Sequence, residues 1–347
     1  MAASIDVVIP AYNNYKLTDD CLEHLARQTI GHRTIVVDNG SNDGTGERLR
    51  TDWPGVTVVS LPENVGFTAA ANRGVQSGEG EIVVLVNNDV QLRPDCLERL
   101  TAPLLSEPGL GSTAALMLAP GEQTIDSLGV TVDPTLAAFA RLQGLPAATA
   151  HTDAAATAQT STTTTADTST AATGQTNAAT TGGGQPVLAG PEGTTAAYRR
   201  SAWEQVGGLD EAMRAYMEIV DLALRLRSAG WQTRAVPEAV GVHLGSRTYG
   251  RRTAEQRRLA GFSRGYLLRR YGVLRGRAAL RALATEAIVV AGDLALCHDA
   301  EALRGRLAGW RAARGLPRRE WPPAEAIDSS IGLSRSLRLR RGAVAGP

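Results

Sequence analysis

Carboxylate and amide side chains follow two apolar runs near the start of the chain, and their chemistry suits a metal ion and a nucleotide. Asp89 comes after the run 82–86 and the pair Asn87-Asn88. A carboxylate in that place can hold a hard divalent cation, which in turn binds phosphate oxygens. Asp38 follows the run 34–37, and its acceptor oxygens suit a nucleobase imide or a ribose hydroxyl. Each carboxylate could instead cap a helix or stabilise a turn.

A second acidic group lies in the stretch YMEIVDLALR, residues 216–225. On a helix, Glu218, Asp221 and Arg225 would share one face, because residues three and four apart are neighbours. The two carboxylates either belong to an active site or form a solvated face with an internal Asp221–Arg225 ion pair. His243 stands within VHLGS. A lone histidine is more often a packing or surface residue, so His243 becomes a candidate only if it converges with Asp89.

The elements that position these residues alternate between strand and helix. Short apolar runs predict strands at 5–10, 34–38, 56–61 and 81–86, and helical spacing predicts helices at 15–28, 45–50 and 67–76. This order is typical of a mostly parallel sheet covered on both faces. Ligands of such a sheet gather beyond the carboxyl ends of its strands. The polar stretches 10–14, 38–41 and 87–89 fall at three such ends, and we expect them to form one site.

The second half of the chain predicts fewer strands. Helices are expected at 92–105, 201–206 and 211–229, and strands at 109–118 and 232–236. Residues 147–185 contain no Leu, Ile, Val, Met or aromatic residue. Such a segment cannot bury enough apolar surface to offset its chain entropy, so it is interpreted as a disordered insertion in a loop.

The last hundred residues are basic and predicted to be helical, with breaks at Gly272 and Pro317. The whole chain has a formal net charge of only +1, but from Arg247 onward 21 Arg face 8 acidic residues, a surplus of 21 − 8 = 13. Such a tail could contact an anionic membrane or a nucleic acid, or it could be a set of solvated helices. We predict peripheral membrane contact and no nucleic-acid partner. The chain is thus divided into 1–250 and an Arg-rich helical extension, 251–347.

Several functional classes are disfavoured. No Gly-x-Gly-x-x-Gly follows the first strand and no Gly-Lys-Ser/Thr phosphate loop occurs, which argues against a dinucleotide oxidoreductase and a P-loop enzyme. Three scattered Cys suit neither a disulfide framework nor a metal cage, so a cytoplasmic location is expected. No signal peptide is predicted. The most apolar stretch, 282–297, is short and interrupted by Glu286 and Asp293, so no membrane span is expected.

The chain also carries an ordered set of short motifs. In sequence these are VVDNGSNDG (36–44), ENVGF (63–67), ANRG (71–74), VNNDV (86–90), DSLG (126–129), Gly190 with Thr195 and Arg199-Arg200, VGGLDE (206–211), Asp221-Leu222 with Arg225, and His243 with Ser246. Together they resemble family 2 glycosyltransferases, particularly the rhamnosyltransferase-like branch. The resemblance covers roughly residues 4–270, and although each motif is weak the ordered set is specific.

The resemblance implies a GT-A fold and an inverting enzyme that uses a nucleotide-sugar donor with Mg or Mn. The acceptor would be a hydroxyl of a glycan, a lipid-linked intermediate or a secondary metabolite, and the overall resemblance suggests rhamnose as the sugar. Asp38 would contact the base or ribose, Asp89 would bind the metal, and His243 would assist the metal or the diphosphate. The other residues matching the nucleotide-sugar pocket are Pro10, Tyr12, Asn13, Asn64, Gly66, Arg73, Asn87 and Asn88.

The chain departs from the family at the expected catalytic base. The family commonly has Glu-Asp-x-Asp-Leu, and the Asp after Glu is taken as the base. Here the aligned residue is Ile219, which cannot accept a proton. Three explanations remain open: Glu218 serves as the base, Asp221 does, or transfer has been lost or greatly slowed. The leading hypothesis is an active hexosyl- or deoxyhexosyltransferase. The alternatives are a non-catalytic GT-A protein that binds a nucleotide sugar or a partner enzyme and, more weakly, a nucleotidyltransferase.

Overall fold

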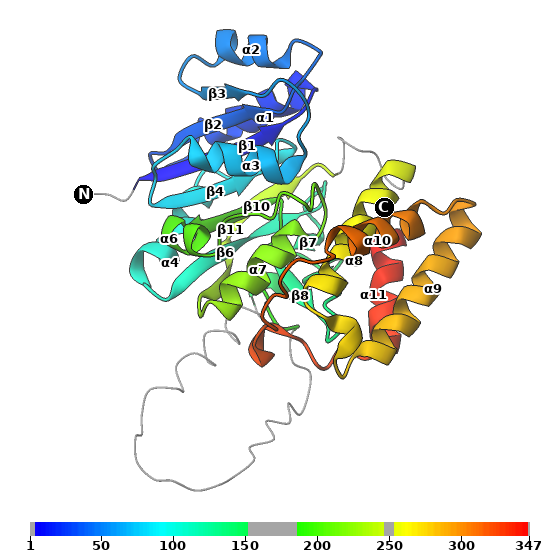
Figure 1. Ribbon diagram of the computed structural model, residues 1–347. Coiled ribbons are helices and arrows are strands. Elements are labelled where there is room, and N and C mark those ends of the chain that lie inside the picture. Colours follow the sequence, from blue (N-terminus) through cyan, green and yellow to red (C-terminus); the bar gives the residue numbers. More distant parts are fainter. Residues whose placement is uncertain (1–3, 152–185, 246–252, 346–347) are drawn as a thin grey trace, which may run out of the picture.

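The computed structural model describes residues 4–151, 186–245 and 253–345, and its centre is a sheet flanked by helices (Figure 1). Nine strands of the described chain form this sheet, with β7 paired to β6 beside the main path. The path runs β3 (Thr57–Ser60), β2 (Arg33–Asp38), β1 (Ile5–Ala11), β4 (Ile82–Val86), β10 (Thr195–Arg199), β6 (Leu110–Leu118), β11 (Gln232–His243) and β5 (Val90–Leu92), and β7 spans Ile125–Ser127.

The sheet is mixed but mostly parallel, as predicted. Strands β1 to β4 are parallel to one another, and β6 and β11 point the same way. Strand β10 is inserted antiparallel between β4 and β6. The first four strands are rich in Val and Ile, which favour a pleated surface buried on both faces. A separate hairpin pairs β8 (Val130–Val132) with β9 (Ala138–Ala140).

Two apolar layers cover the sheet. One layer joins Val7, Ile9 and Val84 to α1, α2 and α4, and the other joins Val8 and Ile35 to α3, α6 and α7. Residues that alternate along a strand point to opposite faces, which explains why Val7 and Val8 belong to different layers. The helices are α1 (Tyr15–Leu25), α2 (Thr45–Asp52), α4 (Cys96–Ser106), α3 (Phe67–Gln76), α6 (Arg200–Gln205) and α7 (Glu218–Ser228).

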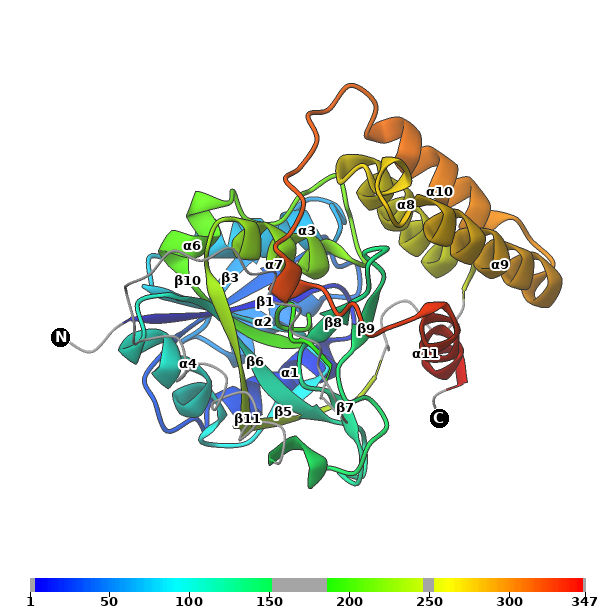
Figure 2. The same ribbon diagram turned by 90° about the horizontal axis from the view of Figure 1, so that it is seen from below.

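A helical extension follows the sheet, and Figure 2 shows α8, α9 and α10 together on one side of the molecule. It consists of α8 (Ala254–Arg270), the 3-10 turn η1 (Val273–Arg275), α9 (Ala279–Cys297), α10 (Glu301–Ala312), η2 (Ala324–Ala326) and α11 (Leu333–Ala345). The predicted breaks at Gly272 and Pro317 are found. The break between α9 and α10 was not predicted, and there His298 adopts a left-handed conformation with φ 54°.

Helices α8 and α10 pack in close parallel contact through glycines. A Cβ built at Gly261 or Gly265 would overlap the backbone of α10, and one built at Gly305 or Gly309 would overlap the backbone of α8. Glycine at these four positions therefore allows the two backbones to approach each other directly. This pairing makes α8 and α10 one rigid unit of the extension.

Three sequence predictions require correction. The predicted helix 211–229 begins only at Glu218, because Tyr216 and Met217 adopt left-handed conformations that end the preceding loop. The predicted helix 92–105 begins at Cys96, since 90–92 pair with β11. Residues 147–151 are not part of a disordered insertion, because Ala150 is buried among apolar neighbours. The remainder, 152–185, and the domain boundary at 250/251 lie outside the described residues, so the division into domains stays a prediction.

Candidate active site

The loops after β1 and β2 lie at the same edge of the sheet and are tied together. Ala11 pairs with Asp38 in the parallel register, so both strands end together. The Asn13 N–H donates to Ser41 Oγ at 2.8 Å, and the Asn42 N–H donates to Asn13 Oδ1 at 3.0 Å. Asn13 and Asn14 both have positive φ, a conformation that Asn tolerates better than most residues. This edge includes the predicted nucleotide residues Pro10, at the end of β1, and Tyr12, just after it.

Asp38 is the last residue of β2 and is buried at this edge. One carboxylate oxygen accepts the Ser41 N–H at 3.1 Å. The other rests on the first turn of α2, where a Cβ built at Gly46 would overlap it. Gly46 therefore makes the space that the Asp38 carboxylate occupies.

This packing predicts the effect of Gly46→Ala. Alanine favours a helix more than glycine by about 1 kcal/mol, so α2 itself should not be weakened. The new methyl group would instead displace the Asp38 carboxylate, and we expect nucleotide-sugar affinity to fall about 10- to 100-fold. Isothermal titration with a nucleoside diphosphate measures this. Gly31→Ala, where no atom lies within 4 Å of the new Cβ, is the matched control. Unchanged affinity in Gly46→Ala would remove Asp38 from the proposed pocket.

The β3–α3 loop, which carries Asn64 and Gly66, is fixed between two other loops. The Asn39 amide donates to Asn64 Oδ1 at 3.2 Å and to the Gly66 carbonyl at 3.3 Å. On the other side, Arg214 donates to the Asn64 carbonyl at 3.0 Å, and its own carbonyl accepts the Phe67 N–H at 2.9 Å. The loop is thus shared between the nucleotide edge and the loop that precedes Glu218.

The other residues predicted to bind the nucleotide sugar are less well placed to contact it. The Asn88 amide is buried and donates to Thr18 Oγ1 of α1 at 3.1 Å. The Asn87 N–H donates to the Thr194 carbonyl at 2.9 Å. Arg73 is exposed and lies six residues into α3, about 9 Å along the helix axis from its first residue. For these three residues, contact with a donor stays a prediction.

Asp89 and His243 do converge, which is the condition that made His243 a candidate. Strand β11 pairs His243 with Val90, and His243 Nε2 lies 3.4 Å from Asp89 Oδ2. On the other side of the ring, His243 Nδ1 lies 2.8 Å from Asp126 Oδ2. Burial lowers the pKa of His243, but hydrogen bonds to Asp126 and Asp89 outweigh it and raise that pKa to about 10.

Sequence reasoning missed the role of Asp126. The residue lies in β7 and belongs to the motif DSLG, but nothing in the chain order connects it to His243, 117 positions later. Only the pairing of β7 with β6, and of β6 with β11, brings the two side chains together. Asp126 fixes the orientation of the imidazole and turns Nε2 toward Asp89.

The pair Asp89 and His243 fits a divalent cation with two protein ligands. Among the described residues no group of three His, Cys, Asp or Glu forms a complete metal cage. Asp89 Oδ2 and His243 Nε2, 3.4 Å apart, could nevertheless both bind one ion, which would displace the proton that the two aspartates hold on the imidazole. A Mg²⁺-type ion commonly takes one or two protein ligands and completes its shell with water and substrate phosphates. The donor set therefore fits an ion that arrives with a diphosphate.

Glu218 is the first residue of α7, and its carboxylate is buried. It follows two strained residues, Tyr216 and Met217, with φ 65° and 59°. Within the described chain, its Oε2 atom has no hydrogen-bond partner. Burial, with a smaller contribution from the charge of Glu192, raises the pKa of Glu218 to about 7. A carboxylate that titrates near neutral pH and keeps a free oxygen is suited to general-base chemistry.

Ile219 packs into the apolar layer over the sheet. It is 5% exposed and belongs to the same buried cluster as Tyr198 and Leu222. A Cβ built at Gly193 would lie 3.2 Å from its side chain. The position at which the family commonly keeps its base is therefore part of the core in this chain.

Asp221 is held in a buried ion-pair network. Arg225 Nε lies 2.9 Å from Asp221 Oδ2, and Tyr271 Oη donates to Asp221 Oδ1 at 3.2 Å. Arg319 forms a further ion pair with the same carboxylate. Arg225 also donates to the carbonyls of Val206 and Gly208, each at 2.6 Å. Asp221 therefore braces α7 against its surroundings, which matches the ion-pair alternative for this residue.

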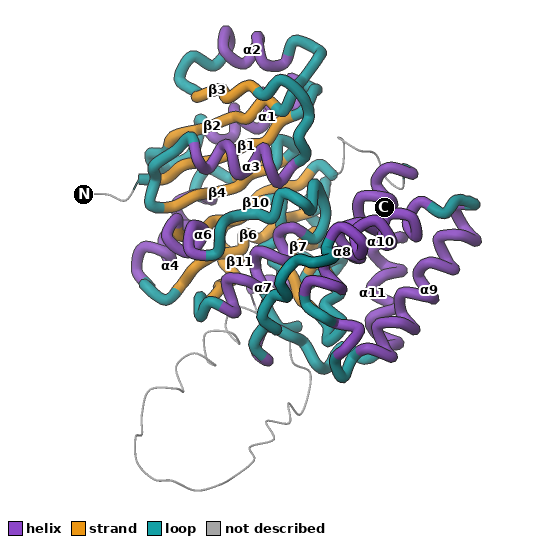
Figure 3. Tube along the Cα trace, viewed as in Figure 1, coloured by secondary structure: helices purple, strands orange, loops and turns teal. Residues whose placement is uncertain are grey.

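The helical extension supports the loop that leads to Glu218. Ser263 Oγ of α8 donates to the Ala215 carbonyl at 2.9 Å, and Tyr266 Oη donates to Asp210 Oδ2 at 2.9 Å. After α10 the chain forms a long loop that passes beside α7 (Figure 3), where Arg319 binds Asp210 as well as Asp221. A cavity of about 960 Å³ is lined by residues of α3 and α6, by residues 206–211, and by Arg225, Arg270 and Arg319. It includes none of Asp38, Asp89 and Glu218.

Known proteins resemble this chain over much of its length. Residues 6–147 match the model of the family described as glycosyl transferase family 2. An N-acetylglucosaminyl-diphospho-decaprenol L-rhamnosyltransferase of Mycobacterium tuberculosis is 28% identical over 228 residues, which are 62% of this chain and 68% of that protein. Over residues 6–147 the chain is similar to glycosyl transferase family 2. As the motifs predicted, the chain is a glycosyltransferase that resembles the rhamnosyltransferase-like branch.

Other known proteins also resemble this glycosyltransferase. Glycosyltransferase GlyG of Streptococcus pneumoniae is 32% identical over 104 residues, which are 29% of this chain and 35% of that protein. A mannosyltransferase of Pyrobaculum calidifontis, solved with GDP-Man and Mn²⁺, superposes with a TM-score of 0.51 at 17% identity, covering 98% of this chain and 86% of that one. GalNAc-T7, solved with UDP, GalNAc and Mn²⁺, gives a TM-score of 0.54 at 12% identity, covering 82% and 54%. The predicted GT-A fold with a C-terminal helical region is thereby confirmed.

Proposed function

We propose that this glycosyltransferase moves a hexosyl or deoxyhexosyl group from a nucleoside diphosphate donor to an acceptor hydroxyl in one inverting displacement. The observation that supports this best is the Glu218 carboxylate, which is buried, has a free oxygen and a pKa near 7, and begins α7. In the reaction, the acceptor oxygen bonds to the anomeric carbon while the bond from that carbon to the diphosphate breaks. Glu218 takes the proton of the acceptor hydroxyl.

The remaining residues bind and orient the donor. Asp38, Tyr12 and Asn64 contact the nucleotide at the edge where β1 and β2 end. Asp89 and His243 hold Mg or Mn, and Asp126 keeps the His243 ring in position. When bound, the metal offsets negative charge on the diphosphate. Both solved structures named above contain Mn²⁺, which supports a divalent metal in this proposal.

The relatives guide the choice of substrates. The rhamnosyltransferase of M. tuberculosis is named for an acceptor that consists of N-acetylglucosamine linked through a diphosphate to decaprenol. We therefore propose a sugar carried on a lipid diphosphate as the acceptor class and rhamnose as the first donor sugar to test. Such an acceptor lies in a membrane, so we place the enzyme at the cytoplasmic face of a membrane, with the helical extension in contact with it.

A donor panel tests the proposal. The purified protein is heated with nucleoside diphosphate derivatives of rhamnose, mannose, N-acetylglucosamine and N-acetylgalactosamine, each with Mn²⁺, Mg²⁺ or EDTA. A ligand that binds the folded state raises the melting temperature. We expect one donor to stabilise the protein only when metal is present, and to be consumed when an acceptor is added. Stabilisation by no donor, or equal stabilisation in EDTA, would overturn the proposed donor site.

One observation favours a second candidate function. Because Ile219 occupies the position of the usual base and packs in the core, the chain could bind a nucleotide sugar without turning it over. This alternative predicts donor binding equal to that of an enzyme, with no product under any acceptor condition.

A further inference from the structure

Helix α9 carries an apolar stripe that the rest of the protein does not cover. Of its 19 residues only Ala282 and Thr285 are buried. Four exposed side chains, Leu280, Leu283, Ile288 and Leu294, are 84%, 52%, 47% and 42% exposed. They follow helical spacing, and the small residues Ala284, Ala287, Ala291 and Ala295 fill the same face. We call these eight residues the α9 stripe.

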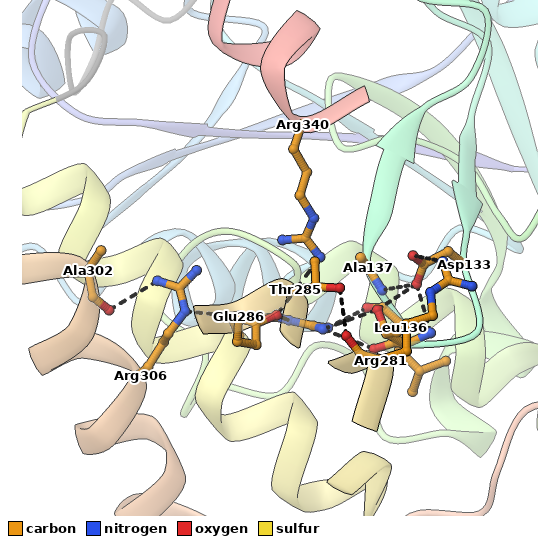
Figure 4. A network of polar contacts seen from close by, with 11 residues as sticks. Asp133, Leu136, Ala137, Arg281, Thr285, Glu286, Ala302, Arg306 and Arg340 are labelled. Carbon is orange, nitrogen blue, oxygen red and sulfur yellow. Dashed lines mark hydrogen bonds and ion pairs between the residues drawn. The ribbon is translucent and has the colours of Figure 1, made fainter. Parts of the chain in front are cut away.

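The polar side of α9 is the side that faces the protein. Arg281 binds Asp133 at 2.8 Å and donates to the Ile331 carbonyl at 2.6 Å. Glu286 binds Arg264 at 2.7 Å and Arg306 at 2.8 Å (Figure 4). These contacts fix the rotation of α9 about its axis. An ordinary surface helix turns its apolar face inward, whereas α9 turns its polar face inward and leaves its apolar face outside.

Charge around the stripe identifies its partner. No acidic residue interrupts the stripe, because the two acidic residues of α9 lie elsewhere: Glu286 is held by arginines, and Asp293 lines a cavity with Arg257 and Arg306. The exposed Arg275 and Arg277 come directly before α9. An apolar helix face with arginines beside it matches the boundary between anionic head groups and lipid chains.

We infer that the α9 stripe is the surface by which this enzyme docks on an anionic membrane. The stripe extends over 16 residues, from Leu280 to Ala295, about 22 Å along the helix, and lies in the plane of the membrane rather than across it. Among the described residues no helix has the length and hydropathy needed to cross a bilayer. The inference rests on the proposed function, because an acceptor carried on a lipid requires an enzyme held at the membrane surface.

Vesicle co-sedimentation tests the inference with the full chain. The stripe variant combines Leu280→Gln, Leu283→Gln, Ile288→Gln and Leu294→Gln, and the control combines Leu105→Gln with Leu316→Gln, two leucines 49% and 44% exposed elsewhere. We expect wild type and control to bind phosphatidylcholine vesicles that contain phosphatidylglycerol, and the stripe variant to bind at least about tenfold more weakly. Added salt should also weaken vesicle binding, because it screens the attraction between arginines and anionic head groups. The double variant Arg275→Gln with Arg277→Gln should weaken vesicle binding for the same reason.

Three outcomes would overturn the inference. The first is equal binding of wild type to neutral and anionic vesicles, and the second is full binding by the stripe variant. The third is a wild-type dimer in solution that the stripe substitutions convert to a monomer, because the stripe would then be covered by a second copy. Turnover with a short water-soluble acceptor is measured in parallel. If neither wild type nor any variant turns over the acceptor while wild type still binds anionic vesicles, the proposed function is contradicted and the docking surface is not.

Discussion

Replacing Glu218 by glutamine is expected to lower kcat by about 10²–10⁴-fold, the usual contribution of a general base. Glutamine has nearly the same shape but cannot take a proton. Donor affinity should remain close to that of the wild type, because Glu218 acts on the acceptor. Steady-state kinetics together with donor titration measure the two effects separately. Glu63→Gln, an exposed carboxylate on the β3–α3 loop, serves as the control. Loss of donor binding in Glu218→Gln would point to a structural role instead.

The pH dependence of kcat is a second test of Glu218 as the general base. The pKa of Glu218 is raised from 4.5 to about 7 by burial, so the base form appears only as pH rises through about 7, and kcat should rise with it. The free energy of unfolding changes with pH in the opposite direction to kcat. Between pH 4.5 and 7 the folded protein holds a proton that the unfolded chain has released, so this group's contribution is present at low pH and is lost as pH rises.

Glu218→Gln should therefore be at least as stable as the wild type at pH 8, although its kcat is expected to be much lower. Thermal unfolding at pH 5 and pH 8 measures this. A variant that is much less stable at both values would mean that Glu218 supports the fold, and its loss of activity would then be uninformative about the base.

The second large effect is expected at Asp89. Replacing Asp89 by asparagine should abolish the rise in melting temperature that the sugar donor gives with Mn²⁺. Turnover should fall by about 10³-fold or more, because the diphosphate charge would no longer be offset.

Asp126→Asn should weaken metal affinity less than Asp89→Asn does, by about 10- to 100-fold, since Asp126 acts through His243. Asp95→Asn at the start of α4, a partly exposed carboxylate paired with Arg99, is the control. Full metal-dependent donor binding by Asp89→Asn would contradict the assignment.

The first half of the fold could be predicted from the sequence because its signals are local. The runs of Val and Ile that form β1, β2 and β4 are short and uninterrupted, and polar residues follow each one. Parallel strands then bring Asp38 and Asp89 to one edge without further information. The positions of these two residues therefore followed from pattern alone.

The rest of the site depends on contacts between distant segments. Asp126 reaches His243 only through the order of β7, β6 and β11. The stretch before Glu218 looks helical, but its backbone bonds to α3 and α8 and leaves Tyr216 and Met217 in left-handed conformations. A helical pattern in one segment carries no information about such partners.

Several arginines of the helical extension form ion pairs within the protein and do not face solvent as free charges. Arg264 and Arg306 neutralise Glu286, and Arg319 reaches Asp210 and Asp221 beside the candidate base. The first two arginines hold the helices of the extension together, whereas Arg319, together with Arg281 through its ion pair with Asp133, joins the extension to the rest of the protein. The extension also carries the α9 stripe, so the proposed docking surface and the contacts that support the Glu218 loop lie in the same set of helices.

We propose that this chain is an active transferase although residue 219 carries no carboxylate. This proposal is tested most directly by the rate of sugar transfer by wild type and Ile219→Asp, measured side by side with the donor that the panel identifies. We expect measurable turnover by the wild type and a slower, less stable Ile219→Asp, because residue 219 packs in the apolar layer, where a carboxylate is costly. A wild type that binds donor but makes no product, together with a sharp gain of turnover in Ile219→Asp, would contradict it.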